Sequence, residues 1–247
     1  MEDKSLNKYI SETGVCSRRA ADKLIEEGRV TLNGVVARKG NRATEMDNVE
    51  IDGKPLIAKP EIVYLALNKP RGVTSTTDLN DPANMIEFLN YPSRIFPVGR
   101  LDKDSDGLIF LTNDGDIVNK ILRAGNNHEK EYVVTVNHII NDDFIEKMSN
   151  GVPILDTITQ KCVVTKEDPF KFRIILKQGL NRQIRRMCEE LGYQVRTLTR
   201  VRIMNMTLEN IPLGKWRYFT TQEITEINQL ISTSSKTEEA SVLEMGE

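Results

Sequence analysis

The sequence of 247 residues is poor in the side chains that most often bind metals or act as nucleophiles. It contains three cysteines, which form no C-x-x-C pair, and two histidines, neither of which has a cysteine at metal-ligand spacing. A zinc site is therefore disfavoured. Ser-His or Cys-His catalysis is disfavoured too, because its general base would have to be one of those two histidines. We expect no metal site, and chemistry that uses carboxylates, tyrosines or basic groups.

Long hydrophobic runs are absent as well. No apolar stretch approaches the length of about 20 residues that spans a bilayer, so we expect no membrane association. The first residues, M-E-D-K-S-L, lack the basic and apolar regions of a signal peptide, which predicts a cytoplasmic protein. Hydrophobic residues make up 39% and charged residues 28%, as in ordinary globular proteins, and the length suits one large domain and one small one.

The chain as a whole carries no large excess of one charge, but several of its segments do. The formal net charge is -2. Residues 4–42, however, hold nine Lys and Arg against four Asp and Glu, and residues 171–202 hold nine against two. Residues 220–247 hold one Lys and six Glu. The two basic segments favour a polyanionic partner more strongly than the total charge suggests.

An acidic loop, V-G-R-L-D-K-D-S-D-G at residues 98–107, runs into the apolar sequence L-I-F-L-T. The carboxylates of Asp102, Asp104 and Asp106 alternate along it, as in a helix-loop-helix calcium site. The twelfth position of that motif is Asn113, which supplies no bidentate carboxylate, and two prolines precede the loop where a helix is needed. Calcium binding is therefore disfavoured, and the loop is a candidate site of catalysis.

Residues 1–58 form a predicted small unit in which two helices are followed by short strands. Ser17 is expected to cap a helix over residues 18–27, and Asn33-Gly34 predicts a tight turn between two strands. Further along the chain, hydrophobic periodicity and turn residues predict strands at 62–67, 108–112, 128–136, 170–177 and 193–203, and helices at 115–122, 142–150 and 221–230.

The small unit also carries an expected RNA-binding face. By themselves its basic residues are equally well explained as a solvated helix face. The stretch S-R-R-A-A-D-K-L-I-E-E-G-R-V-T-L-N-G at residues 17–34, however, resembles the S4-like RNA-binding domain. The resemblance implies that the helix and the following loop grip the RNA backbone with little choice of sequence. The residues of this face are Arg18, Arg19, Lys23, Arg29, Arg38 and Lys39.

Four further motifs follow in order: N-K-P-R-G-V at 68–73, G-R-L-D at 99–102, K-E-Y at 130–132 and R-Q-I-R-R-M at 182–187. With the S4-like unit they resemble the pseudouridine synthases of the RsuA family, and residues 181–193 most resemble its large-subunit branch. The resemblance implies an α+β fold: a small α/β S4-like RNA-binding domain at 1–58, and a catalytic domain at 62–230 with a mixed, mostly antiparallel β-sheet and flanking helices. Residues 231–247 are expected to be a disordered acidic tail.

The resemblance also implies a reaction, the conversion of a uridine in RNA to pseudouridine. Asp102 would be the catalytic residue, Tyr132 would stack on the target base and Arg185 would pair with Asp102. Helical spacing places Arg185 about 100° from Ile184, at the flank of a buried stripe, where it can border a pocket. Whether Asp102 attacks the ribose carbon or removes a ribose proton stays open. No cofactor is expected, because isomerisation consumes nothing. Further RNA contacts are expected from Arg100, Arg182, Arg186 and Arg200.

The expected partner is ribosomal RNA of the large subunit, with transfer RNA as an alternative substrate, and the family implies a monomer. Two other classes of protein compete with this interpretation. A non-catalytic protein that binds ribosomal RNA would not need Asp102, Tyr132 and Arg185 together. A glycosidase would need a second carboxylate beside the scissile bond, such as Asp104 or Asp106, but the basic surfaces suit a sugar substrate poorly.

Overall fold

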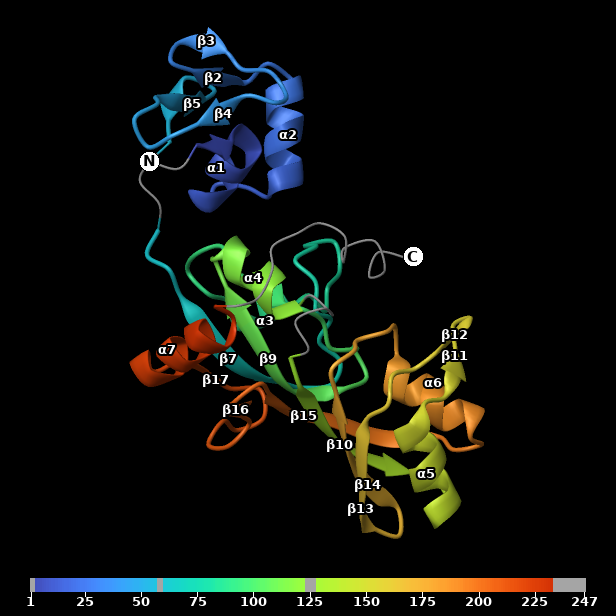
Figure 1. Ribbon diagram of the computed structural model, residues 1–247. Coiled ribbons are helices and arrows are strands. Elements are labelled where there is room, and N and C mark those ends of the chain that lie inside the picture. The colour runs from blue at the N-terminus through green and yellow to red at the C-terminus, as the bar shows by residue number, and fades with distance from the viewer. Residues whose placement is uncertain (1–2, 57–59, 123–127, 233–247) are drawn as a thin grey trace. The chain divides into compact units, whose positions relative to one another are not determined.

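A computed structural model describes residues 3–56, 60–122 and 128–232 of the chain. Its contacts divide the chain into two compact units (Figure 1). The smaller unit comprises Met1–Val63 with the short segments Tyr91–Ile95 and Asn113–Gly115, and the larger unit comprises Tyr64–Asn90, Phe96–Thr112 and Asp116–Glu247.

The smaller unit packs two helices against short strands. The side chain of Ser17 accepts a hydrogen bond from the amide of Ala20 and so caps the second helix, as predicted. Asn33 and Gly34 both have positive φ, 52° and 80°, which is the conformation of a tight hairpin turn and confirms the second prediction. Its elements are β1 (Lys4–Ser5), α1 (Leu6–Glu12), α2 (Arg18–Glu26), β2 (Val30–Leu32), β3 (Val35–Val36), β4 (Arg42–Ala43), β5 (Val49–Ile51) and β6 (Lys54–Pro55), with sheet orders β3-β2-β5-β6 and β1-β4.

The larger unit is built on a nine-stranded sheet with the strand order β13-β14-β10-β15-β9-β7-β17, to which β16 adds beside β15 and β8 beside β9. The described strand pairs of this sheet are antiparallel except β15 with β9, so the predicted mixed, mostly antiparallel sheet is confirmed. The strands are β7 (Tyr64–Lys69), β8 (Phe96–Val98), β9 (Asp106–Thr112), β10 (Lys130–Val136), β13 (Val163–Asp168), β14 (Lys171–Leu176), β15 (Val195–Ile203), β16 (Met206–Thr207) and β17 (Trp216–Tyr218).

Strand β9 lies at the centre of this unit and is covered on both faces, because every residue from Gly107 to Thr112 is buried. It joins β15 through a parallel pairing in which Gly107 stands opposite Arg200. Gly107 has a φ of +112°, and a Cβ there would lie 2.3 Å from the carbonyl oxygen of Arg200. Only glycine lets the two strands approach at this position.

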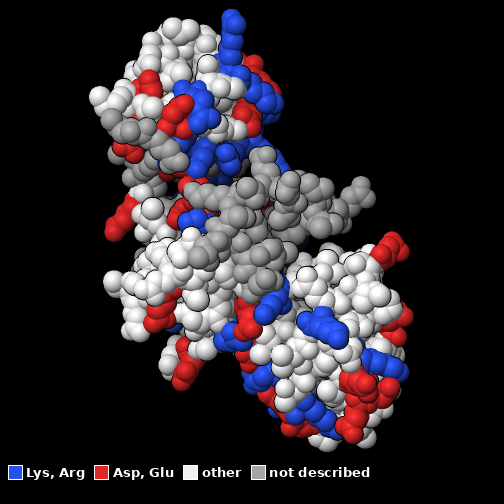
Figure 2. All heavy atoms as spheres, in the orientation of Figure 1, with Lys and Arg blue, Asp and Glu red and all other residues white. Residues whose placement is uncertain are grey.

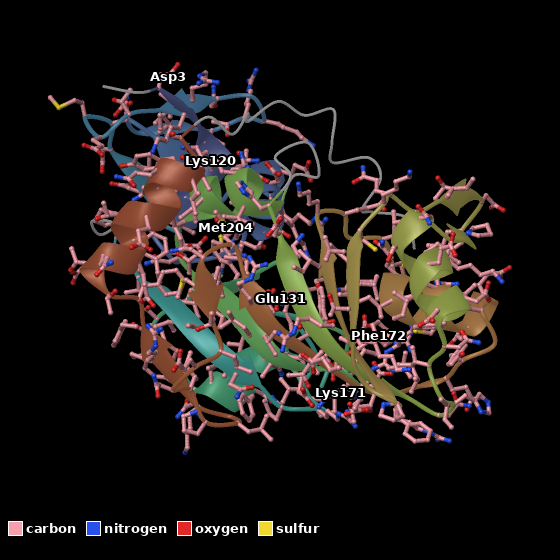
Figure 3. All side chains as sticks on the ribbon, turned by 60° about the horizontal axis from the view of Figure 1, so that its bottom comes forward. Asp3, Lys120, Glu131, Lys171, Phe172 and Met204 are labelled. Atoms are coloured by element: carbon pink, nitrogen blue, oxygen red, sulfur yellow. The ribbon has the colours of Figure 1, made fainter. Side chains whose placement is uncertain are left out.

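Helices cover the sheet at both ends (Figure 1). At one end, α4 (Gly115–Leu122) and α7 (Thr221–Leu230) contribute Ile117 and Ile227 to a core that includes Phe110. At the other end are α5 (Asp142–Asn150), whose Phe144 meets Phe172 of β14 at a ring-centroid distance of 5.3 Å, and α6 (Gln183–Glu190). Phe172 is labelled on the sheet in Figure 3. The remaining elements are α3 (Met85–Leu89) and the hairpin of β11 (Pro153–Ile154) and β12 (Thr157–Ile158).

The helices predicted at 115–122, 142–150 and 221–230 are confirmed with their bounds. Ile231, which the sequence places in the acidic tail, is 2% exposed in the core beside α7, so the folded part extends past the predicted start of the tail. The rest of that tail, residues 233–247, lies outside the described residues. No helix within the described ranges is both long enough and apolar enough to cross a bilayer.

Candidate active site

The acidic loop connects β8 to β9 and therefore lies at the N-terminal end of the buried strand β9. It begins at Gly99, whose φ is +77° and whose Cβ, if present, would lie 2.7 Å from the side chain of Leu122. It ends at Gly107, where the chain joins the parallel pairing with β15. At both ends of the loop the backbone therefore adopts a conformation that suits glycine, and a residue with a side chain would strain the backbone there.

Asp102 lies in this loop with two arginines of the α6 region beside its carboxylate. Its Oδ2 is 3.9 Å from Nε of Arg185 and 3.6 Å from Nη1 of Arg182. The side chain of Asp102 is 36% exposed. The structure thus places together the two residues that the sequence assigns to the catalytic ion pair, and leaves one side of the carboxylate open to solvent.

Asp104 lies closer to the same two arginines than Asp102 does. Its carboxylate oxygens are 3.2 Å from Arg182 and 3.4 Å from Nε of Arg185. Partial burial would raise the pKa of the Asp104 carboxyl, but the hydrogen bond from Arg182 and the charge of Arg185 outweigh it and hold that pKa below its usual value. Asp104 is therefore an anion that shares both cations with Asp102.

Arg185 is held from the inside of the fold. It lies on α6 and is only 8% exposed, and its Nη2 donates to the hydroxyl of Ser105 and to the main-chain carbonyl of Asp104, both at 3.1 Å. Ser105 itself is fully buried. Nε makes no hydrogen bond within the described residues and faces the two carboxylates. The predicted position of Arg185, at the flank of the buried stripe of its helix, is confirmed.

Two residues that the sequence did not single out for this purpose fix the main chain just before Asp102. The hydroxyl of Ser75 donates to the carbonyl of Leu101 at 2.8 Å and accepts from its amide at 3.1 Å. Arg200 donates from Nη1 to the carbonyl of Arg100 at 3.3 Å and from Nε to that of Leu108 at 2.6 Å. Both side chains are buried, so these bonds are shielded from water and hold the loop in one geometry.

Lys69 supports the loop from the end of β7. It is fully buried, and its ammonium group donates to the carbonyls of Pro70 and Val73 at 2.9 Å and 2.8 Å. Burial lowers the pKa of Lys69 to about 8, against the opposing attraction of Asp106. The lysine of the N-K-P-R-G-V motif thus shapes the turn that follows it.

A cavity of about 700 Å³ opens above Asp102. Six of its lining residues are cationic and two are acidic, so it carries a positive excess although the whole chain is slightly negative. Such a charge suits an anionic ligand that enters from solvent. The lining residues are Arg71, Gly72, Thr74, Ser75, Arg100, Leu101, Asp102, Lys103, Asp104, Arg182, Arg185, Val195 and Arg196.

Tyr132, the third predicted catalytic residue, lies apart from this pair. It belongs to β10, where it stands opposite Arg200 of β15, one strand further from the loop. Its side chain is half-buried and does not line the cavity. The structure therefore brings Asp102 and Arg185 together and places Tyr132 on a neighbouring strand.

The predicted RNA-binding residues fall into different settings. Arg18, Arg19 and Lys23 are exposed on α2, and Figure 2 shows Lys and Arg side chains of the smaller unit gathered on the side where Figure 1 shows that helix. Of the other residues of this face, Arg38 is exposed, Arg29 pairs with Asp52 at 2.6 Å and Lys39 pairs with Glu26 at 3.2 Å.

In the larger unit, Arg100 and Arg182 line the cavity, and Arg186 is half-buried and donates to Asn181. Arg200 requires a correction. It is 3% exposed and its guanidinium bonds to main-chain carbonyls, so it supports the loop from inside and is not presented at the surface as predicted.

The calcium alternative does not fit the loop. The segment after it is the strand β9, not a helix, and Asp104 and Asp106 are directed at Arg182 and Arg71, each at 3.2 Å. The same ion pairs occupy the carboxylates that a glycosidase would use as the second catalytic acid. Across the described ranges, His, Cys, Asp and Glu form no cluster of three or more that could hold a metal ion.

Two family models match the chain. One, described as RNA pseudouridylate synthase, matches residues 63–190, and the S4 domain matches residues 5–49. Among solved structures, the crystal structure of a pseudouridylate synthase superposes with a TM-score of 0.66 at 28% sequence identity, and the match covers 92% of this chain and 99% of that one.

Curated relatives cover nearly the same span. The dual-specificity RNA pseudouridine synthase RluF of Escherichia coli K12 is 57% identical over 232 residues, which are 93% of this chain and 80% of the relative. The ribosomal large subunit pseudouridine synthase B of Bacillus subtilis is 35% identical, over 91% of this chain and 96% of the relative.

Proposed function

The chain belongs to the RNA pseudouridine synthase family, and from this premise we propose that it converts a uridine in large-subunit ribosomal RNA to pseudouridine. The predicted resemblance to this family and the predicted S4 domain are confirmed. The observation that carries the proposal is the carboxylate of Asp102, which lies beside Arg185 and Arg182 in a cavity whose charged lining residues are mostly cationic. The name of the B. subtilis relative, a large-subunit ribosomal enzyme, supports the choice of RNA.

The reaction is an isomerisation, so its atoms balance without a co-substrate. The bond between N1 of the uracil and C1′ of the ribose breaks, the uracil turns, and its C5 joins C1′ while the proton of C5 is lost and N1 gains one. Asp102 acts on the ribose, either as nucleophile at C1′ or as the base that removes a ribose proton. A stacked nucleotide hides these atoms, so the target is flipped into the cavity, at a cost of a few kcal/mol in lost stacking.

Arg185 positions the carboxylate of Asp102, from which its Nε lies 3.9 Å away. Arg185 is buried and held by Ser105, so it provides a charge of fixed position and not a mobile surface group. This preorganised charge orients Asp102 toward the ribose.

Tyr132 and Arg100 complete the site. Tyr132 is proposed to lie against the uracil ring, as aromatic side chains do with extruded bases. Tyr132 does not line the cavity itself, but β10 pairs with β15, which carries the cavity residue Arg196, so the flipped base must extend past the cavity toward β10 to reach it. Arg100 is exposed at the cavity and directly precedes the pair Leu101-Asp102, so it is proposed to hold the stack that the flipped nucleotide leaves.

The two parts of the chain divide the task. Residues 1–58 are proposed to hold the RNA backbone through the basic face of α2, and residues 62–230 to carry the reaction. Binding should therefore weaken with salt, because phosphate contacts release counterions. The protein is proposed to act as a monomer in the cytoplasm. Transfer RNA is a second candidate substrate, favoured by the "dual-specificity" in the name of the E. coli relative.

Pseudouridine mapping on ribosomal RNA tests the proposal. The RNA comes from cells that lack the protein and is incubated with the wild type or with Asp102→Asn, then labelled with carbodiimide and read by primer extension. A new stop with the wild type alone supports the reaction, the role of Asp102 and the choice of RNA together. We expect Asp102→Asn to lower the rate more than about 10³-fold, as loss of a central catalytic group does.

The failing outcomes are also informative. If the wild type gives no stop on ribosomal RNA but one on transfer RNA, the substrate assignment is wrong and the chemistry stands. If neither RNA is modified although both proteins bind ribosomal RNA tightly, the chain is a binding protein with the fold of the family. If Asp102→Asn is as active as the wild type, another residue carries the reaction.

A further inference from the structure

We propose that Arg71 and Arg196 together bind a backbone phosphate of the RNA beside the target nucleotide. The proposal rests on the proposed function, since it assigns to the same cavity a second position that holds substrate. Both arginines line the cavity that contains Asp102. Neither belongs to the catalytic ion pair, and neither was singled out as an RNA contact by the sequence.

The charges of the cavity leave Arg196 uncompensated. Arg182 and Arg185 face the carboxylates of Asp102 and Asp104, so part of their charge is balanced inside the protein. The side chain of Arg196 is exposed and makes no hydrogen bond or ion pair with any described residue. An arginine that has no anionic partner at the wall of a basic cavity is available to bind an anionic group of the ligand.

Arg71 is presented by a turn that is tied down on both sides. The ammonium group of Lys69 donates to the carbonyls that bracket this turn, at Pro70 and Val73. The amide of Gly72, whose φ is +88°, donates to the carbonyl of Lys103 in the acidic loop at 2.8 Å. The fixed main chain of this turn sets where the Arg71 guanidinium can reach, which favours a contact of defined position.

The side chain of Arg71 also connects to Arg196. Its Nε is 3.2 Å from Oδ2 of Asp106, and its Nη2 donates to the carbonyl of Arg196 at 3.5 Å. The Arg71 side chain nevertheless remains 43% exposed. The guanidinium of Arg71 is thus anchored along one edge next to the main chain of Arg196, and both residues line the cavity.

The ligand that fits two arginines here is a phosphodiester. Guanidinium groups bind phosphate oxygens in pairs, and their charge does not depend on pH in the working range. Asp102 must meet the ribose of the target nucleotide inside the cavity. The phosphates on either side of that ribose then lie at the wall of the cavity, where these arginines are. The contact sets affinity and register but reads no base.

The test compares Arg196→Gln and Arg71→Gln with Lys147→Gln, which removes an exposed cation of α5 that does not line the cavity. Dissociation constants for a transcript of large-subunit ribosomal RNA are measured by filter binding at several salt concentrations. Loss of one phosphate contact should lower the slope of log K against log salt by about 1. Arg196→Gln is the decisive variant, because Arg71→Gln also leaves Asp106 without its cation.

We expect weaker binding and a reduced slope for both cavity variants, and an unchanged slope for Lys147→Gln. A wild-type slope in Arg196→Gln overturns the proposal, and so does a lowered saturated rate with unaltered binding, which would make Arg196 part of the chemistry. Failure of the proposed function would be seen separately. In that case even the wild-type protein would form no pseudouridine, whatever the salt slopes of the variants are.

Discussion

The hydroxyl group of Ser75 makes two hydrogen bonds with the main chain of Leu101, one to its carbonyl and one from its amide. Leu101 directly precedes Asp102, so a side chain 26 residues earlier in the sequence decides where the candidate catalytic carboxylate stands. Ser75 is 6% exposed, which keeps water from replacing either bond. We therefore infer that Ser75 is a positioning residue, which affects the reaction through the main chain of the acidic loop.

Replacing this serine should slow the reaction more than it weakens the protein. Ser75→Ala removes both hydrogen bonds and lets the loop shift, and a shift of about 1 Å can cost roughly 10²-fold in rate. We expect a lower rate at saturating RNA, an unchanged dissociation constant for RNA and a loss of about 2 kcal/mol in the free energy of unfolding, because the buried main-chain groups of Leu101 lose their partner. Thr77→Ala removes an exposed hydroxyl nearby and serves as control. Equal rates in the two variants would remove Ser75 from the mechanism.

The arginine beside Asp102 gives a second prediction. Arg185→Ala should lower turnover roughly 10²-fold, because a preorganised charge at the reacting carboxylate is lost. RNA binding should remain largely intact, since the side chain is 8% exposed. Arg186→Ala is the matched control on the same helix: its guanidinium bonds only to Asn181 among the described residues, so we expect weaker RNA binding without a lower saturated rate. Single-turnover kinetics with a binding isotherm separates the two effects, and parallel losses of rate and binding in Arg185→Ala would contradict the role assigned to it.

The pairing of Asp102 with Arg185 was predicted from the resemblance of their motifs to those of the family, whereas the place of Arg185 on its helix follows from short-range patterns. Helical spacing puts Arg185 at the flank of an apolar stripe, and the structure places it there. The helices at 115–122 and 221–230 were predictable for the same reason, since each carries an amphipathic pattern that tertiary packing then uses.

The supporting residues could not be predicted, because their partners are distant in the sequence. Arg200 bonds to Leu108 and Arg100, residues 92 and 100 positions away, and a strand with alternating arginines looks solvated until the pairing of β15 with β9 is known. Ser105 leaves no pattern either, as a single buried hydroxyl has no period. Strand β13 was missed because its residues are mostly exposed, so it shows no alternation of apolar and polar side chains.

Glu131 gives a prediction about stability at low pH. It occupies the middle of the K-E-Y motif on β10 and is labelled in Figure 3. Its carboxylate accepts hydrogen bonds from Arg173 and Arg202, each at 2.6 Å, and its side chain is 14% exposed. Partial burial would raise the pKa of Glu131, but the bonds from Arg202 and Arg173 outweigh it and hold the pKa below 4.5.

The sign of the pH dependence follows from that direction. A carboxyl whose pKa is lower in the folded state than in the unfolded state stabilises the fold above the unfolded value and loses this contribution as the pH falls through the folded one. Glu131→Gln should therefore lower the free energy of unfolding by about 2 kcal/mol at pH 7, and the difference from wild type should shrink below about pH 4.5. Urea unfolding at several pH values measures this difference in the free energy of unfolding between the variant and the wild type. The exposed Glu209→Gln is the control, and a difference that is constant with pH would refute the linkage.

The last prediction concerns Gly107, where both the positive φ and the close approach of the neighbouring strand require glycine. Its φ of +112° is unfavourable for any other residue, and a Cβ there would lie 2.3 Å and 2.6 Å from the carbonyl oxygen and the amide nitrogen of Arg200. These are main-chain atoms of the neighbouring strand, so they cannot move aside as the end of a side chain would. Gly107→Ala must therefore push β15 away from β9.

Gly115, the first residue of α4, is the matched control, since a Cβ added there meets nothing within 4 Å. We expect Gly107→Ala to lower the free energy of unfolding by roughly 3 kcal/mol or more, and Gly115→Ala to leave it unchanged or raise it slightly, because alanine favours the helix. Thermal unfolding of the two variants beside the wild type is the measurement. Separation of β15 from β9 would also move Arg200 off the carbonyl of Arg100, so any folded Gly107→Ala protein should have lost most of its activity. A variant with wild-type stability and rate would show that the parallel pairing does not hold the loop.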